Sequence, residues 1–210
     1  MSFKVEFKNY LDELHKSLCE VSDWMYENPE LGFQEFKTSK HLVDYIQKNS
    51  KSVNYPSHGL ETAFDVTFGD DGPLVVICVE YDALPEIGHA CGHNIIATAS
   101  IGAGLGLKEI ASKLGIRVKL LGTPAEEGGG GKIILINEGA FEDASCSMMI
   151  HPGYEDVVNP TFTTIEQYTV EYFGKDAHAA GAPDQGINAL DAQIQLFVNA
   201  STYRQQMVQS

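Results

Sequence analysis

The densest group of chemically active side chains follows an apolar run at residues 74–80. The sequence YDALP, at 81–85, is followed by HACGHN at 89–94. One glycine separates Cys91 from His93, so a loop can fold both side chains onto one ion, and Asn94 can then cap the helix that follows. A thiolate and an imidazole favour zinc-like metals. A helix-capping turn with a buried cysteine would fit the same residues.

A second group of side chains, in TPAEEG at 123–128, offers two adjacent carboxylates after another apolar run. Two neighbouring carboxylates can have different roles in a metal-assisted hydrolysis. Glu127 can stay ionised as a metal ligand, while Glu126 takes a proton from an activated water and passes it to a leaving amine. A solvated acidic turn at a helix N-terminus is the alternative interpretation.

Three further residues extend these two groups. His151, in IHPG, follows a third apolar run, and His178 lies in GKDAHAAG. Asp82 can orient a ligand imidazole or merely hold a turn, and His178 can face a substrate or be an ordinary loop histidine. Open α/β sheets place their sites at the carboxyl ends of strands. We therefore expect Cys91, His93, Glu127 and His151 to meet at one edge of a sheet.

The elements that would position these residues can be predicted from hydrophobic periodicity. Apolar residues at steps of three and four between Phe3 and Met25 predict a helix that ends before Pro29, and a second helix covers 36–48. Buried strands are predicted at 62–68, 74–80, 116–122 and 145–150, and helices at 94–114 and 131–141. Gly102, Gly104 and Gly106 mark close packing of the helix at 94–114. The fold class is therefore α/β, a mixed sheet flanked by helices.

The composition changes after His151. A linker with Pro, Gly, Asn and Asp at 152–162 precedes a predicted strand at 167–174 and a predicted helix at 187–207. We place one domain at 1–157 and an incomplete second domain at 158–210.

Charge and composition exclude several classes of function. The chain has 14 Lys and Arg against 29 Asp and Glu, a net charge of −15, which disfavours nucleic acid and anionic membrane surfaces as partners. No apolar stretch is long enough for a membrane span. The N-terminus lacks a secretory pattern, and four scattered cysteines suit a reducing compartment. We expect a cytoplasmic protein.

Several of these motifs together resemble a known family. They are similar to motifs of the M20 metallopeptidases, specifically the amidohydrolase branch and its dipeptidases. The motifs are NPELGFQEFKTS, YDALPEIGHACGHN, TPAEEGGGGK, the IHPG histidine and GKDAHAAGAPDQGINALDA. The resemblance implies a catalytic domain with two divalent metal ions, interrupted by an α+β lid that also forms a homodimer. Zinc is the favoured metal, and Mn or Co also fit.

The resemblance also implies individual roles. Cys91, His93, Glu127 and His151 match the metal ligands, and Glu126 matches the general base. Asp82 matches the residue that orients the site, while Glu80 stands where other branches have a ligand histidine. His178 matches a lid histidine that contacts substrate across the dimer.

The implied reaction is hydrolysis of the amide bond of a dipeptide or an N-acyl amino acid by a metal-activated water. Members of the family are longer, so we expect this chain to be the N-terminal part of such an enzyme or a truncated form. A truncated form would leave a sheet edge uncovered. The alternative function is a non-catalytic remnant that acts only in binding or dimerisation.

Overall fold

The computed structural model of the chain describes residues 2–50, 53–158, 160–162 and 165–207. It divides into two compact units, Met1–Asp156 and Val157–Ser210. The first unit contains the sheet, and each unit is described by itself below.

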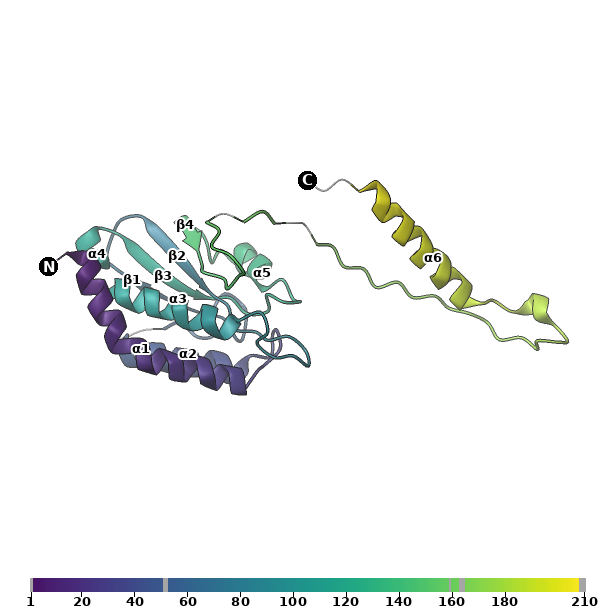
Figure 1. Cartoon of the computed structure of the whole chain (residues 1–210), viewed down its shortest axis with the longest axis horizontal. Coiled ribbons are helices and arrows are strands. Elements are labelled where there is room, and N and C mark those ends of the chain that lie inside the picture. Colours follow the sequence, from purple (N-terminus) through teal and green to yellow (C-terminus); the bar gives the residue numbers. More distant parts are fainter. Residues whose placement is uncertain (1, 51–52, 159, 163–164, 208–210) are drawn as a thin grey trace. The chain divides into compact units, whose positions relative to one another are not determined.

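A four-stranded mixed sheet forms the centre of the first unit (Figure 1). Its strands are β1 (Phe64–Phe68), β2 (Leu74–Val79), β3 (Arg117–Gly122) and β4 (Ala144–Met148), in the order β1-β3-β2-β4. β2 is parallel to β3 and β4, whereas β1 is antiparallel to β3. The predicted mixed α/β sheet is confirmed. Because Val79 pairs with Gly122, the carboxyl ends of β2 and β3 lie side by side.

Helices cover one face of this sheet. α3 (His93–Lys108) lies against β2 and β3, and α1 (Phe3–Glu27) packs on α3, while α2 (Phe36–Asn49) joins the same core. The glycines of α3 permit this approach: a Cβ on Gly104 would lie 2.5 Å from the Leu120 side chain, and Cβ atoms on Gly102 and Gly106 would meet α1. The prediction of close packing at these glycines is confirmed.

A smaller apolar cluster covers the opposite face of the sheet. Val76, Cys78 and Leu121 pack there with Leu135 of α5 (Gly131–Asn137). Because α5 begins directly after the loop that follows β3, its packing fixes the position of that loop. β4 forms one edge of the sheet, and in the described part of the chain no strand pairs with its outer side.

The predicted helix at 94–114 is interrupted. α3 ends at Lys108, and the short α4 (Ala111–Leu114) follows after Ile110, whose backbone leaves the helical region at φ −123° and ψ −7°. The Ile110 side chain is buried. Burial of this apolar side chain favours the interruption of the helix between α3 and α4, which sequence periodicity did not predict.

In the second unit, α6 (Ala189–Tyr203) confirms the predicted helix, with the 3-10 turns η1 (Pro183–Gln185) and η2 (Arg204–Gln206) at its two ends. Asn188 caps α6 by accepting a hydrogen bond from the amide of Leu190 at 3.1 Å. The strand predicted at 167–174 is wrong, because these residues form no strand and only the neighbouring Lys175 bridges to Ile187. A β-ladder requires a partner strand, and the described residues of this unit supply none.

No helix in the described ranges is both long and apolar enough to span a bilayer.

Candidate metal centre

The end of β2 places two buried carboxylates at the sheet edge. Glu80 and Asp82 follow β2, and the side chains of both are almost completely buried. Tyr81, between them, points the other way and donates a hydrogen bond from its hydroxyl to the Thr62 carbonyl at 2.7 Å. This alternation is that of an extended chain, so Glu80 and Asp82 share one side.

His93 enters the same site from the N-terminus of α3. Gly92, in the left-handed conformation at φ 80°, turns the chain into the helix, and His93 is completely buried. The Nδ1 atom of His93 lies 3.0 Å from Asp82 Oδ1. Burial opposes ionisation of Asp82, but the hydrogen bonds from His93 and from the Glu127 amide outweigh it and lower the Asp82 pKa. An ionised Asp82 accepts from Nδ1–H, which leaves Nε2 as the metal-binding atom.

The loop after β3 delivers two more carboxylates. The amide of Glu127 donates to Asp82 Oδ2 at 2.9 Å, so one aspartate fixes both His93 and this loop. Nε2 of His93 then lies 3.7 Å from Glu126 Oε2 and 3.6 Å from Glu127 Oε1. Glu80 Oε2 lies 3.5 Å from the same His93 Nε2 atom.

The atoms around His93 Nε2 lack hydrogen-bond partners. Within the described residues, His93 Nε2, Glu80 Oε2 and Glu127 Oε1 are buried and form no hydrogen bond. Leaving such groups unsatisfied costs about 1–3 kcal/mol each. Two sets of side chains offer ligand atoms within 4.8 Å of one another: Glu80, His93 and His151, and His93, Glu126 and Glu127. This donor set fits divalent cations, because imidazole and carboxylate are both common ligands of such ions.

The same arrangement shifts two pKa values in directions that suit a metal site. Burial lowers the pKa of His93, but the hydrogen bond to Asp82 and the charges of Asp82, Glu80 and Glu127 outweigh it, so the pKa is raised. The acidic surroundings thus favour a cation at His93. Burial, followed by the charge of Glu80, raises the pKa of Glu126. A carboxylate with a raised pKa accepts a proton more readily, as a general base must.

His151 lies close to His93. It follows β4 by three residues and is exposed, and its ring is perpendicular to that of His93 with centroids 6.1 Å apart. Its Nδ1 donates to the Pro152 carbonyl at 2.8 Å, since a carbonyl can only accept. In this tautomer of the neutral ring, the lone pair is on Nε2. β4 ends at Met148, two residues before the predicted end of the strand.

Cys91 lies beside Glu127 but outside both sets of ligand atoms. Its thiol is hydrogen-bonded to Glu127, and this bond, together with burial and the nearby carboxylates, raises the Cys91 pKa to about 11. The thiol is therefore protonated at neutral pH without a metal, and coordination would have to release that proton.

One residue near the site is placed differently from its prediction. Asn94 does not cap α3, so that expectation is wrong: Gly92 is the N-cap, and the Asn94 side chain instead donates to Ser22 Oγ at 3.0 Å and links α3 to α1. Ser22 is distant in sequence, so local spacing could not reveal it. His178 belongs to the second unit, where its Nδ1 accepts from the amides of Ala180 and Gly181 at 3.2 and 2.9 Å.

Sequence reasoning underestimated Glu80. It treated this residue only as a replacement for a histidine, whereas Glu80 lies in the cluster and forms an ion pair with Lys132 of α5. The sequence position of Glu80, two residues before Asp82, could have indicated its place in the cluster. This spacing puts both carboxylates on one side of the extended chain.

An open pocket with a volume of about 630 Å³ adjoins the cluster. Its lining includes Cys91, His151, His89, Tyr26, Ile95 and Tyr154. This volume falls within the range of small-molecule sites, which is about 300–1,000 Å³. Cys91 and His151 therefore face a space that could hold a small substrate.

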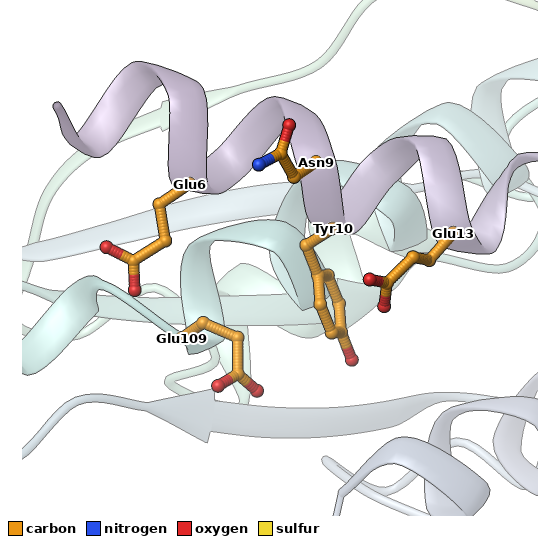
Figure 2. Close-up of a pocket in the computed structure, with 5 residues that line it drawn as sticks. All are labelled: Glu6, Asn9, Tyr10, Glu13 and Glu109. Atoms are coloured by element: carbon orange, nitrogen blue, oxygen red, sulfur yellow. The ribbon is translucent and has the colours of Figure 1, made fainter. Parts of the chain in front are cut away.

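A second hollow lies between α1 and the end of α3, and Figure 2 shows its acidic side chains, Glu6, Glu13 and Glu109. Glu6 pairs with Lys113, and Glu109 lies 3.4 Å from Lys108 Nζ. Two of its three acidic side chains are thus paired with lysines at the surface. We therefore assign no catalytic or binding role to this hollow.

Two curated proteins are similar in sequence to most of this chain. The chain is 39% identical over 211 residues to a Xaa-Arg dipeptidase of Mus musculus, covering 94% of this chain and 49% of the dipeptidase. It is 31% identical over 193 residues to one of the subunits of the p-aminobenzoyl-glutamate hydrolase of Escherichia coli K12, covering 82% of this chain and 40% of that protein. No family model matches the chain.

Among solved structures, a dinuclear metal-binding peptidase of the M20 family from Bacillus subtilis superimposes with a TM-score of 0.58 and 25% identity, covering 65% of this chain and 42% of that chain. The chain spans about half the length of the Xaa-Arg dipeptidase. The family resemblance that the motifs indicated is confirmed: the chain is homologous to the M20 family of peptidases over about half of their length.

Proposed function

We propose that this chain carries the metal centre of an amidohydrolase that cleaves dipeptides or N-acyl amino acids. The observation that supports this most directly is the set of buried, unpartnered atoms around His93 Nε2. Three carboxylates within 3.7 Å of one imidazole nitrogen are electrostatically unfavourable without a cation.

Cys91, His93, Glu127 and His151 would hold two divalent ions, with zinc favoured by the thiol and the imidazoles. When bound, such ions lower the pKa of water and polarise a carbonyl. Asp82 holds the His93 ring through Nδ1 and the Glu127 backbone through its amide. These contacts orient two ligands before any ion arrives.

Glu126 acts as the general base in this proposal. Its side chain is 41% exposed, so it can reach both the cluster and a substrate. It takes a proton from the attacking water, whose oxygen bonds to the carbonyl carbon, and donates that proton to the leaving nitrogen as the C–N bond breaks. Its raised pKa favours the first step, because a more basic carboxylate accepts the proton of the water more readily.

The substrate class follows the relatives, which are named as a dipeptidase and an aminobenzoyl-glutamate hydrolase. We assign Val157–Ser210 to the beginning of a lid that forms a homodimer, with His178 contacting substrate. All four cysteines are free, which supports a cytoplasmic location.

The substitution Glu126→Gln tests the mechanism. Glutamine keeps the size of the side chain but cannot accept a proton, so we expect turnover of a dipeptide to fall about 10²–10⁴-fold while metal content stays the same. Amino acid release and metal per chain are measured on the same samples. Equal turnover in both proteins would refute the role of Glu126. A wild-type chain that binds metal but releases no amino acid would instead favour the non-catalytic alternative.

A further inference from the structure

The segment from Pro29 to Glu35 packs against the loop that carries Glu126 and Glu127. A Cβ on Gly32 would lie 3.0 Å from both Cα and Cβ of Ala125, and a Cβ on Gly129 would lie 2.3 Å from the Phe33 ring. Neither glycine leaves room for a side chain. The two backbones are therefore in direct contact, although they lie far apart in the sequence.

Glu35 makes the polar contact between these two segments. Its side chain is completely buried, and Oε1 accepts a hydrogen bond from the Ala125 amide at 2.8 Å. Its Oε2 accepts from the Thr62 hydroxyl at 3.0 Å. Both carboxylate oxygens are thus used to hold neighbouring chain segments.

The residue that Glu35 holds has an unusual backbone conformation. Ala125 has a φ of 56°, in the left-handed region that residues other than glycine rarely adopt. Its carbonyl accepts from the amide of Gly131 at 3.1 Å. Such a conformation persists only where the surroundings enforce it. Glu35 and the contact with Gly32 provide that constraint.

Glu126 therefore lies between two amides that buried carboxylates hold. Glu35 binds the Ala125 amide and Asp82 binds the Glu127 amide. We propose that Glu35 is a positioning residue, which sets the backbone of Ala125 and thereby directs Glu126 and Glu127 toward His93. The effect of Glu35 on catalysis rests on the proposed function, whereas its effect on the conformation of the loop does not.

Two substitutions at position 35 test this proposal in the full chain. In Glu35→Gln the side chain can still accept from the Ala125 amide and donate to the Thr62 hydroxyl. Glu35→Met has a similar length and can do neither. Hydrogen exchange of the Ala125 and Glu127 amides is measured without metal. We expect protection as in the wild type for the glutamine variant and at least tenfold faster exchange for the methionine variant.

Zinc affinity, measured by competition with a chelating dye, provides a second readout. We expect a change within twofold for Glu35→Gln and a loss of at least tenfold for Glu35→Met. Ser39→Ala is the stability control, because it removes a buried contact of α2 with Tyr55 but leaves Glu35 in place. If Ser39→Ala weakens zinc binding as much as Glu35→Met does, the effect is one of general stability and the proposal fails.

A pair of glycine substitutions tests the same contact without changing charge. Gly32→Ala places a methyl group against Ala125, whereas Gly128→Ala, in the same loop as Glu127, points into open space. We expect only Gly32→Ala to speed exchange at Ala125. Wild-type exchange in both Gly32→Ala and Glu35→Met would overturn the proposal. Absence of dipeptide hydrolysis by the wild type would refute the proposed function alone, since the exchange measurement needs no activity.

Discussion

At the scale of single residues, Asp82 connects the parts of the site. One carboxylate oxygen accepts from His93 Nδ1 and the other accepts from the Glu127 amide, at 3.0 and 2.9 Å. Partners that orient metal ligands in this way contribute about 10–100-fold to metal affinity. The position of Asp82 at the end of β2 explains why it can reach both elements.

We expect Asp82→Asn to weaken metal binding by about 10–100-fold. Asparagine has one accepting oxygen, so either the His93 ring or the Glu127 amide would face its NH₂ group, and two donors would oppose each other. Affinity is measured by dye competition, with Asp44→Asn, an exposed aspartate paired with Lys40, as the matched control. Unchanged affinity in Asp82→Asn would mean that Asp82 does not orient His93.

Much of the site could be predicted from residue types and their positions at strand ends. The structure brings His93, Glu126 and Glu127 together with His151, because parallel strands end at one sheet edge. What could not be predicted depends on distant partners. Asn94 bonds to Ser22, and Glu35 supports Ala125 across 90 residues of sequence.

At the scale of elements, α1 and α2 were predictable from periodicity alone, and a stacked pair of rings also joins them. Trp24 of α1 and His41 of α2 lie with ring centroids 4.1 Å apart and an interplanar angle of 13°. Burial, followed by the charge of Lys48, lowers the pKa of His41. The pattern at 167–174 wrongly predicted a strand, because strand formation also depends on a partner that the local pattern does not reveal.

The His41 pKa predicts a pH dependence of stability. The folded chain binds a proton at His41 less readily than the unfolded chain, whose histidine titrates near 6.5. The free energy of unfolding should therefore rise with pH through the window below about 6.5, and this contribution is lost on acidification. His41→Phe keeps an aromatic ring against Trp24 and removes the titration.

Urea unfolding followed by circular dichroism at pH 5.5 and 7.5 measures this effect. The wild type should lose more stability than His41→Phe when the pH is lowered, and the difference between the two proteins isolates His41 from other titrating groups. A larger loss in His41→Phe would give the opposite sign and contradict the assignment.

At the scale of the whole molecule, the chain combines a high negative charge with uncovered apolar surface. The net charge is −15. In the second unit, α6 exposes an apolar stripe with the period of a helix: Leu190, Ile194, Phe197 and Val198. Such a stripe normally packs against another element. It supports the proposed homodimer through the second unit.

We expect the chain to self-associate through α6, and Phe197→Glu to shift it toward the monomer. A charge in the stripe would have to be buried in the interface, which is costly. Light scattering after size-exclusion chromatography gives the mass at several concentrations. Asn199→Asp adds the same charge on the opposite side of the same helix, at an exposed polar position, and should leave the mass unchanged. If the two variants have the same mass at each concentration, α6 does not form the interface.

X-ray absorption at the metal edge of the zinc-loaded chain tests the central claim most directly. If Cys91 binds zinc together with His93, Glu127 and His151, the spectrum contains a sulfur contribution at about 2.3 Å besides nitrogen and oxygen at about 2.0–2.2 Å. The variant Cys91→Ser should lack the sulfur contribution. A wild-type spectrum with no sulfur, or with several sulfurs and no imidazole, would contradict the proposed centre.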